Sequence, residues 1–161
     1  MKTTIIILLI LTSIFSVTTE QTPDLLIYNS EIIKIKEFPL EPLVENDSRL
    51  KDKLTKDATC INSGCWRQYV GTWKIEKDSL FLVGLKDCCN DKEIKLTKVF
   101  DKNYIKEDKV FAFWYTNSIY AGFGKILENP ENVFVTKYEK RIRIKMSKGI
   151  ITELKVDLNY K

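Results

Sequence analysis

The residues best suited to chemistry in this sequence are its four cysteines. Cys60 and Cys65 lie close together, and Cys88 and Cys89 are adjacent. Outside the cytosol an even number of cysteines usually forms disulfides. Three full pairings are possible, and we favour crosswise bonds between the first pair and the second, because the segment between them is predicted to fold back on itself. A bond between adjacent residues is the weaker choice, since its geometry is strained.

The residues in this sequence give little support for metal binding or catalysis. Zinc ligands usually come as closely spaced Cys and His residues, and this chain contains no His. The commonest general base is missing for the same reason. Neither a nucleophile elbow nor a Gly-rich phosphate loop is present. Glu76 and Asp78 straddle a predicted turn, so we interpret them as solvated carboxylates. The sequence predicts no metal, no cofactor and no enzyme.

Arg67 is the candidate recognition residue. It lies between Trp66 and Gln68, at the start of a strand that should be largely buried. A buried guanidinium needs a carboxylate, carbonyl groups or an aromatic face as partner. We therefore interpret Arg67 first as a structural ion pair or stacking residue, and second as a residue that recognises an anion or a protein partner.

The N-terminal segment is typical of a secretory signal peptide. A lysine at position 2 is followed by an apolar run from Ile5 to Phe15 and then by small residues. This run is shorter than the ~20 residues that a membrane-spanning helix needs. We expect a signal peptide over residues 1–20, one β-rich domain over 21–161, and a secreted or periplasmic protein with no membrane span after cleavage. The net charge of +4 is too small to indicate nucleic-acid binding.

The elements that must position these residues centre on the stretch 65–85, which predicts two long strands joined by a turn at Lys77 and Asp78. A two-residue loop would set Trp73 opposite Leu82, whereas a three-residue loop would set it opposite Val83. Both registers pair apolar with apolar side chains, so the pattern leaves the choice open.

Other segments predict further strands. Runs at 25–28 and 32–38 flank a turn, 110–115 predicts a buried central strand, and 119–127 returns from a tight turn at Asn117 and Ser118. The polar stretch 45–59 predicts a long loop with a helical turn around 49–54, and 94–100 is either a strand or a short helix.

The C-terminal residues predict an amphipathic hairpin. Ile142, Ile144 and Met146 alternate with basic residues, and a second alternating run follows Gly149. A three-residue loop at 147–149 points all apolar side chains inward. It also sets Arg143 opposite Glu153.

The motif Trp66-Arg67-Gln68-Tyr69-Val70-Gly71-Thr72-Trp73-Lys74-Ile75, followed by Leu80-Phe81-Leu82, resembles the core of an uncharacterised family of small bacterial proteins. That core is of the Trp-Arg-Gly-Tyr-x-x-Thr-Trp-Glu-Ile type, from which Gln68 and Lys74 depart. The segment 110–116 resembles a second family stretch. This resemblance implies a family but no established activity. The Gly-x-Trp at 71–73 is also similar to that of lipocalin-like barrels, although it lies mid-chain and is better explained by packing.

These observations together predict a mainly β fold of ~8–9 strands in antiparallel hairpins, closing into a barrel or strongly curved sheet with little helix. The first functional hypothesis is an exported, non-enzymatic binding protein of the cell envelope or exterior. The alternatives are an immunity or inhibitor protein for a secreted partner, and a carrier whose aromatic-lined barrel holds a small apolar ligand. An exposed aromatic patch over a solid core would favour protein binding, and an empty apolar cavity would favour the carrier.

Overall fold

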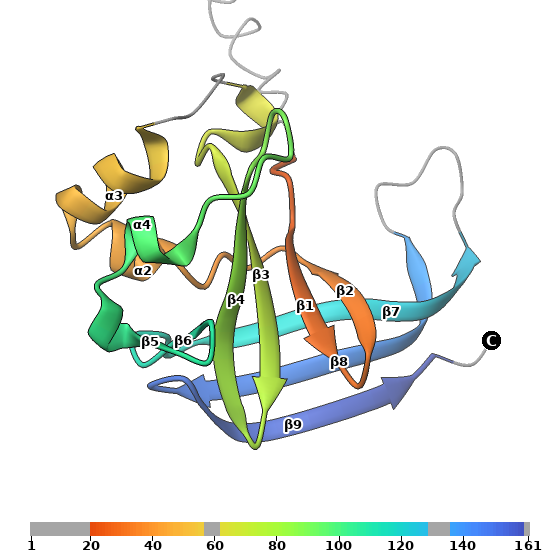
Figure 1. Cartoon of the computed structure of the whole chain (residues 1–161). Coiled ribbons are helices and arrows are strands. Elements are labelled where there is room, and N and C mark those ends of the chain that lie inside the picture. The colour runs from red at the N-terminus through yellow and green to blue at the C-terminus, as the bar shows by residue number, and fades with distance from the viewer. Residues whose placement is uncertain (1–19, 57–61, 129–135, 160–161) are drawn as a thin grey trace, which may run out of the picture.

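The fold is a nine-stranded sheet curved into a nearly closed barrel (Figure 1). The computed structural model describes residues 20–56, 62–128 and 136–159. The strands are β1 (Asp24–Tyr28), β2 (Glu31–Ile35), β3 (Tyr69–Glu76), β4 (Ser79–Asp87), β5 (Ile105–Lys106), β6 (Lys109–Phe111), β7 (Ser118–Glu128), β8 (Lys137–Ser147) and β9 (Ile150–Leu158). The short helices are α2 (Glu41–Val44), α3 (Ser48–Thr55) and α4 (Leu96–Val99), with 3-10 turns η1 (Ser63–Cys65) and η2 (Lys102–Tyr104). The predicted mainly β, barrel-like class is confirmed.

The sheet folds into two halves that cross steeply. Its strand order is β2-β1-β3-β4-β9-β8-β7, with β6 attached beside β4. Figure 1 shows β1 to β4 upright and β7 to β9 running across them. The ends of the order meet where β7 passes β2, and there the Tyr120 amide donates to Glu37 Oε1 at 3.1 Å. The interior between the halves is filled by buried side chains, including Tyr69, Trp73, Leu82 and Ile144.

The central hairpin has the shorter of the two predicted loops. Glu76 pairs with Ser79 and Trp73 pairs with Leu82, so only Lys77 and Asp78 form the turn. Both turn residues have positive φ, which is the geometry that a tight two-residue hairpin requires. A bulge next to Trp73 then shifts the register of the rest of the ladder.

The first strand joins the central hairpin in an unexpected direction. β1 and β2 form the predicted hairpin around a turn at Asn29 and Ser30. On its other edge β1 pairs with β3 in parallel, with Leu25 opposite Thr72 and Ile27 opposite Lys74. A parallel pair needs a long crossover, and the segment between β2 and β3 provides one that carries α2 and α3.

The segment 110–115 differs from its predicted secondary structure. The strand predicted over 110–115 ends at Phe111, because the chain turns at Phe113 and Trp114, where the Tyr115 amide donates to the Ala112 carbonyl at 2.9 Å. It therefore forms no hairpin with β7, which pairs with β8 instead.

The helical turn predicted around 49–54 is the two-turn helix α3, whose N-terminus is capped by Asp47. The ambiguous stretch at 94–100 contains helix α4.

The predicted register of the C-terminal hairpin is wrong. The loop contains only Lys148 and Gly149, and a bulge at Thr152 restores the inward facing of the apolar side chains. Consequently Glu153 lies opposite Lys145 rather than opposite Arg143, and their side chains form an ion pair at 2.6 Å. The apolar pattern is satisfied by a bulged strand just as well as by a longer loop.

A disulfide between Cys65 and Cys88 ties the two ends of the central hairpin together. This is one of the crosswise bonds that the sequence predicts. Cys89 is also disulfide-bonded, and no described cysteine is free. Cys60 lies outside the described residues, so the second crosswise bond stays a prediction. The predicted signal peptide also lies almost entirely outside them.

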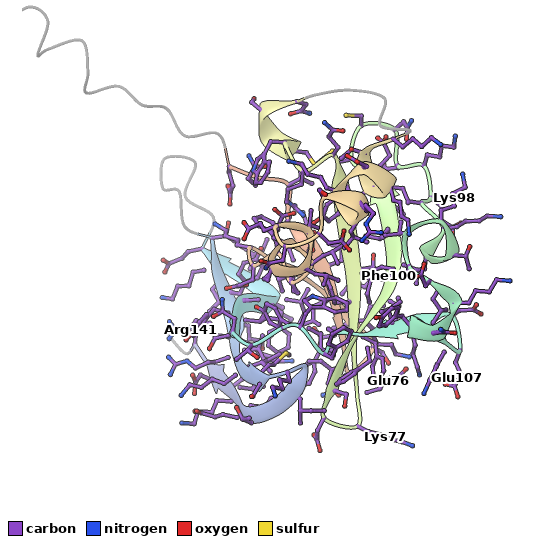
Figure 2. All side chains as sticks on the ribbon, turned by 90° about the vertical axis from the view of Figure 1, so that its left-hand side faces the viewer. Glu76, Lys77, Lys98, Phe100, Glu107 and Arg141 are labelled. Carbon is purple, nitrogen blue, oxygen red and sulfur yellow. A yellow bond between two sulfur atoms is a disulfide. The ribbon has the colours of Figure 1, made fainter. Side chains whose placement is uncertain are left out.

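Two ion-pair clusters should make stability depend on pH. Hydrogen bonds from Lys109 and Lys74 lower the pKa of Glu76 to about 2, and those from Lys145 and Lys155 lower the pKa of Glu153 to about 2. Figure 2 shows Glu76 near the foot of the molecule on the same side as Glu107, a second partner of Lys109. Because folding lowers these pKa values, the stabilisation is present above the ordinary carboxyl pKa of 4.5 and is lost as the pH falls toward 2.

We therefore expect the urea midpoint of unfolding to fall between pH 4.5 and about 2, and to fall less steeply in the Glu153→Gln variant. Glu45→Gln, which removes a carboxylate outside both clusters, serves as the matched control. An unchanged slope in Glu153→Gln would show that this cluster contributes nothing to the pH dependence.

Candidate functional site: an aromatic surface groove

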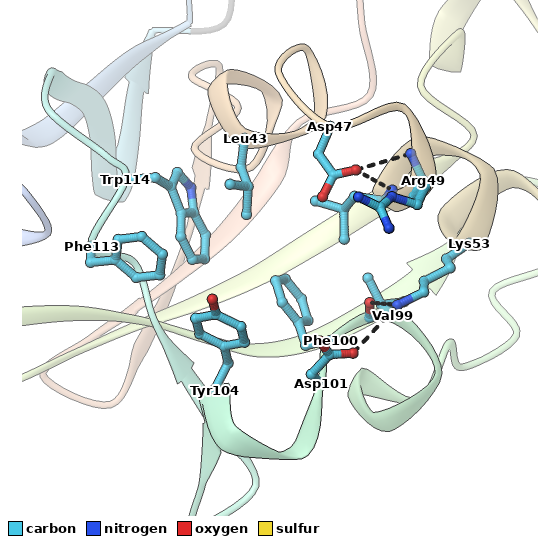
Figure 3. Close-up of a pocket in the computed structure, with 11 residues that line it drawn as sticks. Leu43, Asp47, Arg49, Lys53, Val99, Phe100, Asp101, Tyr104, Phe113 and Trp114 are labelled. Carbon is cyan, nitrogen blue, oxygen red and sulfur yellow. Dashed lines mark hydrogen bonds and ion pairs between the residues drawn. The ribbon is translucent and has the colours of Figure 1, made fainter.

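A groove of about 410 Å³ opens on the side of the barrel that carries the helices (Figure 3). Three separate segments of the chain form its walls: α2 with α3, α4 with η2, and the turn after β6. Its lining residues are Leu43, Asp47, Arg49, Leu50, Lys53, Val99, Phe100, Asp101, Tyr104, Phe113 and Trp114. Its volume lies within the range of ~300–1,000 Å³ typical of ligand pockets.

Four aromatic rings form a continuous ladder along one wall. Phe100 stacks on Trp114 with centroids 6.1 Å apart, Trp114 meets Phe113 edge-on at 5.2 Å, and Phe113 stacks on Tyr104 at 5.9 Å. The ladder runs from the core to solvent, since Phe100 is buried whereas Phe113 is 44% and Tyr104 is 51% exposed. In Figure 3 the Tyr104 hydroxyl points into the groove.

Hydrogen bonds from side chains to backbone carbonyls hold the walls of the groove in place. The Trp114 indole N–H donates to the Pro39 carbonyl at 2.8 Å, which fixes the ring against the entry to α2. Across the groove, Lys53 donates to the Val99 carbonyl at 3.2 Å and so links α3 to α4. Aromatic side chains on such a support lose little conformational entropy when a partner binds.

The wall formed by α3 carries charged side chains. Lys53 extends across the groove to 3.7 Å from the carboxylate of Asp101, and Asp47 uses its carboxylate to cap α3. Within the described part of the chain, no carboxylate comes within ion-pair distance of the Arg49 side chain. The groove thus offers ring faces and one uncommitted guanidinium, a combination enriched at the centres of protein interfaces.

Arg67, the candidate recognition residue, lies outside this groove and is buried. Its side chain and that of Asp24 are both 0% exposed, and Arg67 Nη1 lies 3.1 Å from Asp24 Oδ1. Arg67 also donates to the Thr22 carbonyl at 2.8 Å and stacks 3.7 Å above the Phe38 ring. A guanidinium with a carboxylate, a carbonyl and an aromatic face around it meets the needs of a structural residue.

Asp24 is the centre of this buried cluster. Besides Arg67 it accepts from the Gly71 amide at 3.0 Å and from the Trp73 indole N–H at 2.9 Å. Burial raises the pKa of the Asp24 carboxyl, and the charge of Arg67 and the three donors act against that rise. Gly71 is required here, because a Cβ at this position would lie 2.8 Å from both Asp24 Oδ2 and Trp73 Nε1.

Sequence reasoning did not identify the groove. It treated 110–115 as one buried strand, which hid the fact that Phe113 and Trp114 lie in a turn on the surface. The available signal was the density of aromatic residues from Phe100 to Trp114 among lysines and aspartates. Trp66, at the start of the segment predicted to be largely buried, is also 55% exposed.

Among the described residues, no group of three His, Cys, Asp or Glu side chains could hold a metal ion. No helix within the same ranges combines the length and apolarity needed to cross a bilayer. Comparisons with family models, with curated proteins and with solved structures found no match to this chain.

Proposed function

We propose that this protein is an exported, non-enzymatic binding protein that holds a segment of another protein in the aromatic groove. The observation that carries the proposal is the ladder from Phe100 to Tyr104, whose outer rings are exposed on a rigid support. Exposed aromatic clusters of this kind mark interaction sites. An extended segment with an aromatic or aliphatic side chain and a nearby carboxylate would suit the ring faces and Arg49.

The carrier hypothesis has less support. The space inside the barrel is filled by large side chains such as Trp73 and Tyr69, which are 0% and 1% exposed. A carrier needs an enclosed apolar cavity. The groove instead lies on the outer surface. The immunity and inhibitor hypotheses describe the same kind of surface with a particular secreted partner.

Export is supported by the cysteines. The Cys65–Cys88 disulfide is typical of proteins that fold in an oxidising compartment. The signal-like residues 1–20 point to the same destination. The resemblance to small bacterial proteins adds the proposal of a bacterial source.

The groove can be tested with a peptide probe. The protein without residues 1–20 is immobilised, a displayed library of random peptides is selected on it, and the affinity of the best synthetic peptide is measured by calorimetry. We expect Tyr104→Ala and Phe113→Ala each to weaken that affinity by about tenfold or more, since truncating an aromatic hot spot removes ~1–2 kcal/mol or more.

Tyr120→Ala provides the matched control. Tyr120 is as exposed as Tyr104, at 51%, but it lies on β7 away from the groove. Its replacement should leave the peptide affinity unchanged. The proposal is wrong if no peptide is enriched, or if the enriched peptides bind the two groove variants as tightly as the parent protein.

A further inference from the structure

The outer edge of β9 is open over most of its length. One edge pairs with β8 from Ile150 to Leu158, whereas the other pairs with β4 only where Ser79 meets Ile150. Figure 1 shows β9 diverging from β4 along the foot of the barrel. Among the described strands, none pairs with this edge of residues 152–158. An open edge is a template on which another strand can add.

The backbone groups of this edge can be assigned. The Asn159 amide donates to the Glu139 carbonyl at 2.7 Å, so residues 139 and 159 form a hydrogen-bonded pair in line with the β8–β9 register. Such pairs alternate along an antiparallel ladder. Residues 153, 155 and 157 therefore bond to β8, and Leu154, Val156 and Leu158 direct their N–H and C=O groups outward.

The side chains of Leu154, Val156 and Leu158 expose apolar surface to solvent. Leu154 and Val156 lie opposite Ile144 and Ile142, which are fully buried, so their side chains are on the inner face of the sheet. Yet Leu154 is 38%, Val156 41% and Leu158 48% exposed, because β4 has already diverged and no described strand continues the sheet beyond β9. A strand added at this edge would cover them.

The charges of β9 are complementary to those of an antiparallel copy of itself. Lysine on an edge usually prevents pairing, but Lys155 lies between the carboxylates of Glu153 and Asp157. In a two-fold pair centred on Val156, each Lys155 faces Asp157 of the partner, and Leu154 faces Leu158. Opposite charges in such positions attract and like charges repel.

Two other registers of the β9–β9 pair are less favourable. Centring the pair on Lys155 sets this lysine opposite its own copy and Glu153 opposite Asp157. Centring it on Leu154 carries the partner's Leu158 to Ile150, where β4 already pairs. We infer that the chain forms a two-fold symmetric dimer by antiparallel β9–β9 pairing centred on Val156, which joins two barrels into one continuous sheet.

Sedimentation velocity over a range of micromolar concentrations tests this dimer with charge reversal. We expect the parent protein to dimerise, and Lys155→Asp and Asp157→Lys each to weaken dimerisation by about tenfold, because symmetry makes two attractive pairs repulsive at once. The combined variant with both changes should regain most of the parent affinity. A parent protein that stays monomeric throughout, or a combined variant that is no better than the single ones, overturns the inference.

A second variant separates pairing from folding. The N–H of Val156 points away from β8, so Val156→Pro should preserve the barrel, as proline is tolerated on an edge whose N–H faces solvent. It should abolish the dimer, since it removes a central donor of the new ladder. A well-folded Val156→Pro variant, judged by circular dichroism, that dimerises like the parent would also overturn the inference.

Discussion

Replacing Arg67 with alanine is expected to lower the free energy of unfolding by about 3–5 kcal/mol, because it leaves the buried Asp24 carboxylate without its counter-charge. The variant also loses the hydrogen bond to the Thr22 carbonyl and the stacking of the guanidinium on the Phe38 ring. Arg67→Lys should recover only part of it, since an ammonium group lacks the planar fork that reaches both acceptors. The measurement is guanidinium unfolding followed by circular dichroism.

A double-mutant cycle makes this expectation specific. Arg67→Ala and Asp24→Ala break the same 3.1 Å pair, so their combination should cost less than the sum of the two by about 1–3 kcal/mol. The exposed pair of Lys36 and Glu20, whose side chains are 74% and 71% exposed, is the control. Lys36→Ala should cost less than about 1 kcal/mol. A loss from Arg67→Ala no larger than the loss from Lys36→Ala would mean that the buried pair does not hold the fold together.

Replacing Trp73 with alanine should have an effect of similar size, about 3–5 kcal/mol of unfolding free energy, because the largest side chain of the interior is removed from a site that is 0% exposed. Trp73→Phe keeps most of the volume but loses the donor to Asp24 Oδ2. It should cost about 1.5–3 kcal/mol, as hydrogen bonds to charged groups do.

Trp66 is a suitable control for Trp73, since it lies shortly before β3 but is largely exposed. Trp66→Ala should change the unfolding free energy by no more than about 0.5 kcal/mol. Unfolding has to be followed by circular dichroism, because these variants remove a fluorophore. If the two alanine variants lost equal stability, the division into one buried and one surface tryptophan would be wrong.

The sequence predicted those elements whose determinants are local. The hairpin of β3 and β4 follows from alternation and from the Lys77-Asp78 turn, and the β1–β2 hairpin follows from the same signals. Where two local solutions satisfy one pattern, the prediction failed. The C-terminal hairpin uses a bulge at Thr152 where the pattern equally allowed a longer loop.

Features set by distant contacts were not predictable. Asp24 carried no signal in the sequence, because its role depends on Arg67, Gly71 and Trp73, more than 40 positions further along. The same holds for the groove, whose walls come from three separate segments. That a buried Arg67 needs a carboxylate, carbonyl groups or an aromatic face was clear from chemistry alone, but the identity of its partners was not.

The parallel pairing of β1 with β3 has a consequence for the order of assembly during synthesis. β1 is translated first, yet the Gly71 amide that binds its Asp24 is 47 positions later in the chain. The β3–β4 hairpin needs only local closure, whereas the docking of β1 must first close a long loop. A lone two-stranded hairpin is marginal in water. The β1–β2 hairpin therefore has no stable sheet to pair with until the β3–β4 hairpin has formed, so we expect β1 and β2 to dock after β3 and β4 although they are synthesised before them.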